Sequence, residues 1–222
     1  IGDIFHVKAG DPSSIRITGA TSRFDNVGAE LDGGEVHVVG DVGELAGRLM
    51  KGGKLSVSGN AGPWAGSGLR GGRIEIGGDA GDWLGGPLPG EMAGMRGGLL
   101  WVRRNVGKMA GDRLRRGTIV ISGTAGPYAG SRMVAGTLIV AGKAGPWPGY
   151  LMKRGTLFLR RQPDTVSPTF LDCGSGAEVF RRLFARELLA HGMDVGWIGR
   201  ARLHRFGGDT AVLGKGEIFM PG

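Results

Sequence analysis

Residue types that build reactive centres are scarce in this sequence of 222 residues, which has one cysteine and four histidines. A lone Cys173 excludes an internal disulfide framework and a thiolate metal cluster, and it fits a reducing, cytoplasmic compartment. The histidines are His6, His37, His191 and His204. Their spacing matches neither H-x-H nor H-E-x-x-H, and no carboxylate stands at ligand spacing. We therefore expect no metal site in this chain.

Catalytic, membrane and nucleic-acid signatures are missing as well. The sequence has neither a G-x-S-x-G elbow nor a phosphate loop ending in G-K-[ST], so we expect no catalytic residues. No apolar run approaches the roughly eighteen residues of a membrane span, and no signal-peptide pattern occurs, although the first residue is Ile1 and we expect sequence to precede it. A net charge of +8 predicts an acidic partner. No nucleic-acid-binding motif accompanies that charge.

Glycine, in contrast, is abundant, with 47 residues, and the glycines repeat. From Gly33 to Arg160 the sequence repeats every nineteen residues, apart from a seven-residue insertion at 86–92. Each copy has an alternating apolar run followed by G-x-x-G-x-x-x-G, and only Arg104 departs from glycine among the eighteen motif positions of six copies. A period near twenty residues is typical of a solenoid, in which each coil packs on its neighbours.

The apolar run of each copy predicts a strand with one buried face, because apolar and polar residues alternate. In the copy that begins at Gly52, the inward residues are Leu55 and Val57. Small residues such as Ala61 and Ala80 recur between the motif glycines and fit a narrow interior. Nineteen residues hold a strand and its bends but no additional helix, and parallel crossovers are right-handed. We therefore expect an all-β fold, a right-handed parallel β-helix.

Three regions follow from the extent of the repeat. We expect an irregular opening coil at 1–32, in which 14–19 echoes the strand motif out of step, β-helix coils at 33–161, and a helix with a tail at 162–222. Residues 176–190 have an amphipathic pattern. The residues expected to share its packing face are Val179, Leu183, Phe184 and Leu188. We expect this C-terminal helix to lie across the last coil or to dock on a partner.

Two columns of apolar residues recur once per coil. The first is expected to stack in the core and consists of Met50, Leu69, Met95, Leu114, Met133 and Met152. The second, here called the aromatic column, lies inside the glycine motif and consists of Leu45, Trp64, Trp83, Met109, Tyr128 and Trp147. Its four aromatic members, Trp64, Trp83, Tyr128 and Trp147, either cover the core at a bend or form an apolar strip that docks on another protein.

A third recurring position, directly before each copy, is basic in five coils. This basic column consists of Lys51, Arg70, Arg96, Arg115 and Lys153. Like charges about 5 Å apart repel by roughly 1 kcal/mol even in water, and an ordinary solvated surface mixes both signs. The column is therefore either a solubilising edge or a track for a polyanion or an acidic partner subunit.

The G-x-x-G-x-x-x-G solenoid of 33–160, followed by a short helical tail, resembles the C subunit of formylmethanofuran dehydrogenase and of the related bacterial formyltransferase/hydrolase complex. It is also similar to the C-terminal domain of the glutamate synthase large subunit, which is a structural spacer. A free-standing chain of this length with a C-terminal helix favours the C-subunit family. The content of arginine and glycine indicates a GC-rich bacterial gene and favours the formyltransferase/hydrolase complex.

The resemblance implies a non-catalytic scaffold subunit of a complex that moves a formyl group from formyl-tetrahydromethanopterin to a methanofuran-type carrier and releases formate. The implied partners are a formyltransferase, an amidohydrolase-like hydrolase that holds zinc, and a protein that resembles a molybdopterin-enzyme fold. Carriers of this type have glutamate-rich tails that suit the basic column. The alternatives are the C subunit of a tungsten or molybdenum formylmethanofuran dehydrogenase and a spacer like that of glutamate synthase.

Overall fold

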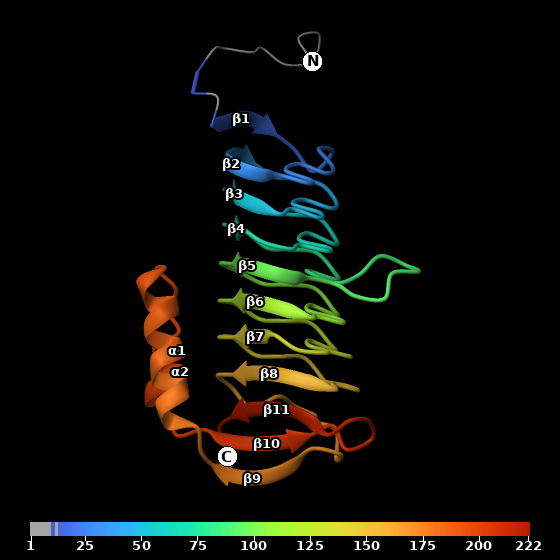
Figure 1. Cartoon of the computed structure of the whole chain (residues 1–222), viewed down its shortest axis with the longest axis vertical. Helices are drawn as coiled ribbons and strands as arrows, with labels where there is room; N and C mark the ends of the chain where they lie inside the picture. Colours follow the sequence, from blue (N-terminus) through green and yellow to red (C-terminus); the bar gives the residue numbers. More distant parts are fainter. Residues whose placement is uncertain (1–9, 12) are drawn as a thin grey trace.

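The computed structural model describes residues 10, 11 and 13–222, so His6 and the first part of the expected opening coil lie outside the described residues. Its strands are β1 (Ser14–Ala20), β2 (Asp32–Gly40), β3 (Gly52–Val57), β4 (Arg73–Ile76), β5 (Arg96–Val102), β6 (Arg116–Ile121), β7 (Thr137–Val140), β8 (Arg154–Leu159), β9 (Leu171–Ser175), β10 (His204–Gly208) and β11 (Lys215–Met220). In the described residues they form one sheet in the order β1 to β8, then β11, β10 and β9 (Figure 1).

The parallel β-helix expected from the repeat is confirmed. Strands β1 to β8 pair in parallel, and the register follows the repeat, since Leu55 of β3 lies opposite Ile74 of β4, and Ile74 opposite Leu100 of β5 across the insertion. These three side chains are fully buried. The period of nineteen residues therefore places one inward residue directly above the next. Strand β1 joins the same ladder with a spacing of 21 rather than 19 residues, since Ile15 lies opposite Val36, and its register shifts after Thr18.

A second wall of the interior is formed by small residues. Short parallel bridges connect Val42, Ala61, Ala80, Val106, Ala125 and Ala144 in succession. All six are buried, as are the six residues from Met50 to Met152 that the repeat assigned to the core. Each coil is therefore held by two rows of backbone hydrogen bonds around a narrow apolar interior.

The motif glycines allow the coils to approach one another closely. Gly66 has a φ of +71°, and a Cβ at this position would overlap the Cδ1 atom of Leu100, which lies in the core. Gly62 shows the second use of glycine, because its Cβ would lie 2.7 Å from the backbone carbonyl carbon of Gly43 in the preceding coil. A side chain at either position would push two coils apart or force the backbone into a strained conformation.

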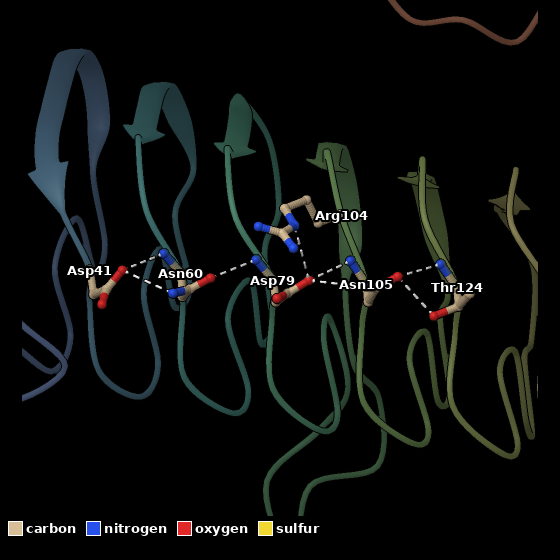
Figure 2. Close-up of polar contacts among 6 residues, drawn as sticks. All are labelled: Asp41, Asn60, Asp79, Arg104, Asn105 and Thr124. Atoms are coloured by element: carbon tan, nitrogen blue, oxygen red, sulfur yellow. Dashed lines mark hydrogen bonds and ion pairs between the residues drawn. The ribbon is translucent and has the colours of Figure 1, made fainter.

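A ladder of polar side chains runs along one bend of the solenoid (Figure 2) and was not recognised in the sequence. Its members directly follow the first motif position and are Asp41, Asn60, Asp79, Asn105 and Thr124. The backbone N–H of Asn60 donates to Asp41 Oδ1 at 2.7 Å, and that of Asp79 donates to Asn60 Oδ1 at 2.8 Å. Arg104, which replaces a motif glycine, lies 3.8 Å from Asp79. Each coil thus satisfies backbone donors of the next.

The C-terminal region closes the solenoid with strands rather than with its helix. Strand β11 pairs in parallel with β8, while β10 and β9 add antiparallel strands beyond it. Helix α1 (Glu178–Ala190) and the short α2 (Trp197–Arg200) instead lie along the outer face of the sheet (Figure 1). Among the described residues, the helices are too short or too polar to cross a bilayer.

The outer face of the sheet explains where the helices pack. The outward column of β5, β6, β7, β8 and β11 is apolar and is covered by residues of α1, α2 and their connections. Its members are Trp101, Val120, Ile139, Phe158 and Phe219. In β2, β3 and β4 the same column holds His37, Ser56 and Glu75, and the helices stop there. The change from polar residues in β2 to β4 to apolar residues in the later strands could therefore have indicated from the sequence that another element packs on the later coils.

The packing face of helix α1 overlaps only in part with the one expected. Leu188 is buried and Phe184 packs against the sheet, as predicted, but Val179 and Leu183 are 73% and 58% exposed. Arg181 and Ala185 are buried instead. The reason is the Arg181 guanidinium, which donates to the carbonyl oxygens of Ile198 at 3.0 Å and Ala201 at 3.1 Å. These bonds compensate the buried charge and orient the helix.

Candidate interaction surfaces

The basic column lies on an exposed edge of the solenoid near the start of the strands. Arg96 is the first residue of β5, Arg70 stands three residues before β4, and the other three members directly precede β3, β6 and β8. All five members are exposed, and within residues 13–222 none takes part in an ion pair. Neighbouring positions extend the row, because Arg154 at the start of β8 lies opposite Lys215 at the start of β11, and both are exposed. Lys215 was missed because it belongs to a strand outside the repeat. From β3 to β8 the column spans about 24 Å, at roughly 4.8 Å per coil.

The cations on the outer face of the sheet that α1 and α2 leave uncovered differ from those of the basic column, because they have partners within the chain. Glu75 lies 2.6 Å from Arg73, 3.9 Å from Arg103 and 4.0 Å from Lys54. The guanidinium of Arg103 also lies over the ring of Trp101, at 4.1 Å from its centroid. These three cations are therefore partnered within the chain, whereas the positive charge of the basic column is open to an external anion.

The aromatic column lies at the surface of the bend, while the residue after each member is buried. Trp64 and Trp83 stack with centroids 5.1 Å apart and an interplanar angle of 7°, and the Lys108 ammonium lies 4.9 Å from the Trp83 centroid. Farther along, Tyr128 and Trp147 are partly exposed. Aromatic faces that remain open to solvent are common at protein interfaces.

A groove of about 530 Å³ lies at the C-terminal end of this column. Its lining consists of Met109, Tyr128, Ser131, Arg132, Trp147, Tyr150 and Leu151. Arg132 donates from Nε and Nη2 to the buried carboxylate of Asp112 at 2.8 and 2.7 Å, and Ser131 Oγ donates to the same carboxylate at 2.7 Å. Because its arginine is already paired, this groove is suited to an apolar or aromatic group rather than to an anion.

The insertion at 86–92 projects from the solenoid between β4 and β5 (Figure 1). Glu91 fixes it, since its side chain accepts from Arg48 Nη2 and from the Leu88 N–H, both at 3.0 Å. The Glu91 carbonyl oxygen accepts from Arg113 Nη1 at 2.8 Å. Met92 is 82% exposed. The chain thus presents an apolar side chain on an anchored loop.

The described histidines lie on different elements, and Cys173 lies on β9, the strand that pairs with the strand of His204. His37 pairs with Glu35 at 2.8 Å on β2, and His204 pairs with Asp172 at 3.1 Å at the opposite end of the sheet. Hydrogen bonds from the Gly174 N–H and from His204 hold the pKa of Asp172 below its ordinary value. Cys173 is exposed. No three His, Cys, Asp or Glu side chains gather into a potential metal site within the described part of the chain.

The outer face of α1 is a surface that the sequence analysis assigned to packing. Val179 and Leu183 lie on it together with Phe180, which is 48% exposed. Beside them, a shallow groove of about 520 Å³ runs between α1 and α2 and is lined by Arg182, Arg186 and Arg200. Three large apolar side chains and three arginines therefore lie together on one exposed surface.

Comparison with known proteins identifies the family. No model of a known protein family matches the sequence. The chain is 55% identical over 221 residues to the C subunit of the formyltransferase/hydrolase complex Fhc of Methylorubrum extorquens, covering all of this chain and 83% of that protein. It also superposes with a TM-score of 0.95 and 44% identity on a chain from the crystal structure of the formyltransferase/hydrolase complex FhcABCD of Methylorubrum extorquens with methylofuran, covering 83% of that chain. The chain therefore belongs to the family of C subunits of formyltransferase/hydrolase complexes.

Proposed function

We propose that this chain is a non-catalytic scaffold subunit of a formyltransferase/hydrolase complex. The observation that carries the proposal is the full-length similarity to the C subunit of such a complex, with a TM-score of 0.95. The described surface supports it, because its distinctive features are extended rows and faces rather than an enclosed polar pocket. A rigid solenoid of this kind holds other subunits at fixed distances, since each coil is locked to the next.

The complex would transfer a formyl group from formyl-tetrahydromethanopterin to a methanofuran-type carrier and hydrolyse the formyl carrier to formate. The partners would be a formyltransferase, a zinc-dependent hydrolase of the amidohydrolase type and a protein that resembles a molybdopterin-enzyme fold. The similar complex was solved with methylofuran bound, which supports this class of carrier. The chemistry would take place in the partners.

Within this complex, the basic column would bind the polyanionic tail of the carrier. The support is electrostatic: five exposed cations lie along about 24 Å, interrupted only by Val134 between Arg115 and Lys153, and none forms an ion pair within the described residues. A flexible tail with several carboxylates gains from such a row because each contact raises the effective concentration of the next. The aromatic column would dock on a neighbouring subunit through its exposed rings.

Gentle affinity purification of the native complex through a tag on this chain tests the membership. We expect mass spectrometry to identify a formyltransferase and a zinc hydrolase. Recovery of tungsten or molybdenum with iron–sulfur subunits would indicate the dehydrogenase instead, and glutaminase and flavin-containing synthase partners would indicate a glutamate-synthase-like spacer.

Charge reversal tests the basic column. In the purified complex, Arg70→Glu, Arg96→Glu and Arg115→Glu together should lower carrier retention and turnover at least tenfold, with a steep dependence on salt. The matched control is Arg160→Glu, Arg161→Glu and Arg202→Glu, which changes the net charge equally at exposed positions outside the column. If carrier retention and turnover are unchanged and the complex assembles normally, the column is only a solubilising edge.

A further inference from the structure

The N-terminal half of the outer face of α1 is apolar where a solvated helix would be polar, and the exposed Glu187 lies on the same face one turn after Leu183. Val179, Phe180 and Leu183 lie within about one turn of one another and are between 48% and 73% exposed. Exposed single hydrophobic residues are ordinary, but a contiguous group with a charged rim is typical of a protein interface. The helix thus has a buried face toward the sheet and a second apolar face toward the outside.

This second face cannot turn inward, because the opposite face of α1 is fixed. Arg181 is bonded to two carbonyl oxygens behind the helix, and Ala185 and Leu188 are buried there. A stack of phenylalanine rings adds a second restraint. Phe219 stacks on Phe158 at 5.1 Å, Phe158 on Phe184 at 5.9 Å, and Phe184 on Phe180 at 5.7 Å. The exposed Phe180 ring is therefore the outermost member of a stack that begins in the sheet, which preorganises the surface for binding.

The charge beside the apolar face indicates the kind of partner. The groove between α1 and α2 is lined by Arg182, Arg186 and Arg200, and no carboxylate belongs to its lining. None of the three arginines takes part in an ion pair within the described residues. The lining also includes Ala185, Leu189, Gly196 and Gly199, and Arg200 Nε donates to the carbonyl oxygen of Gly196 at 3.3 Å. Because Arg182, Arg186 and Arg200 are all exposed, a carboxylate of a partner could reach their guanidinium groups from the solvent side.

We infer that the outer face of α1, with the arginine groove between α1 and α2, docks an apolar surface of another subunit of the complex that carries carboxylates opposite Arg182, Arg186 and Arg200. The inference rests on the proposed function, because it takes the partner from the same complex. A second copy of this chain would bring the same three arginines and a net charge of +8 to the contact, which makes self-association at this face unfavourable. At about 20 Å long, α1 forms one part of a larger interface.

Photo-cross-linking in the purified complex tests the location of the contact. A variant with p-benzoylphenylalanine in place of Leu183 should cross-link to a different subunit, and a variant with the same residue in place of Val212, which is exposed in the loop between β10 and β11, serves as the control. A cross-link from position 183 to a second copy of this chain would overturn the inference. So would the absence of any cross-link in a complex that contains all its subunits.

Substitutions test the chemistry of the contact. Leu183→Ser with Val179→Ser should weaken association with the other subunits at least tenfold, and Arg182→Glu, Arg186→Glu and Arg200→Glu should do the same. The matched control is Val212→Ser with Leu213→Ser, two exposed apolar residues in the loop between β10 and β11, and it should leave association unchanged. Unchanged melting of the isolated variants shows that the fold is intact. The inference would be refuted if both α1 variants assembled normally with the other subunits. It would also be refuted if the arginine variant kept all the other subunits and lost only methylofuran. The proposed function fails separately if the wild-type chain purifies without formyltransferase and hydrolase subunits.

Discussion

Loss of the Arg132 guanidinium should destabilise the chain because it leaves the buried carboxylate of Asp112 without its counter-ion. Asp112 is only 1% exposed and accepts two hydrogen bonds from Arg132, at 2.8 and 2.7 Å, and one from Ser131 Oγ at 2.7 Å. In Arg132→Met, the Ser131 hydroxyl would be the remaining side-chain partner in this network. A buried charge that loses its counter-ion costs about 3–5 kcal/mol.

The open position of Arg132 reduces this cost. Its side chain is partly exposed and lines the aromatic groove, so water can reach the space that it vacates. We therefore expect Arg132→Met to lower the free energy of unfolding by about 2–3 kcal/mol. For a chain of this size, each kcal/mol lowers Tm by about 2–4 °C, so Tm should fall by roughly 4–12 °C.

Thermal unfolding of the isolated chain, followed by circular dichroism, measures this effect. Asp112→Asn in the Arg132→Met background removes the stranded charge but keeps an oxygen for Ser131, so it should restore about 1–2 kcal/mol. Arg96→Met, which removes an exposed and unpaired arginine, should change stability by less than about 0.5 kcal/mol. If Arg132→Met has the same Tm as the wild type, the ion pair contributes nothing to stability and the reasoning is refuted.

Two further predictions concern the bends. Gly66→Ala should cost about 3 kcal/mol in chemical unfolding, because it combines a positive φ with overlap at the buried Leu100. Gly33→Ala, whose methyl group meets no described atom within 4 Å, should cost less than about 0.5 kcal/mol, and equal losses in the two variants would contradict this role of the motif glycine. Glu91→Ala should speed proteolysis within 86–92 several-fold, because Glu91 binds Arg48 and the Leu88 N–H; an unchanged cleavage rate would mean that the loop is held by other contacts.

The solenoid could be predicted because the same packing requirements recur in each coil. Leu55, Ile74 and Leu100 occupy one position of the motif, and stacking requires each to lie beneath the next. Gly66 shows the same regularity, since the third motif glycine recurs in each copy, and a Cβ there would meet a core side chain, such as Ile74 at Gly47 and Leu100 at Gly66. The polar ladder was also present in the sequence, as Asp or Asn at 41, 60, 79 and 105, but it was overlooked among the glycines.

The C-terminal region could be predicted only in part because it lacks repetition. The predicted packing face contained Val179, Leu183, Phe184 and Leu188, and only Phe184 and Leu188 pack. Bonds from Arg181 to the carbonyl oxygens of Ile198 and Ala201 orient the helix so that Val179 and Leu183 are exposed. Such bonds depend on tertiary neighbours that a single sequence does not identify. Lys215 shows the same limit, since its place beside Arg154 depends on the pairing of β11 with β8. The orientation of α1 and the position of Lys215 both help to form surfaces that we propose bind other molecules.

Removal of this chain from the complex tests the scaffold role most directly. The remaining subunits would be produced without it and assayed separately for formyl transfer to the carrier and for hydrolysis of the formyl carrier. We predict that both partial reactions persist while the subunits separate and coupled turnover falls at least tenfold, with recovery when the purified chain is added back. Loss of either partial reaction from folded partner subunits, or a complex that stays assembled and fully active without this chain, would contradict the account.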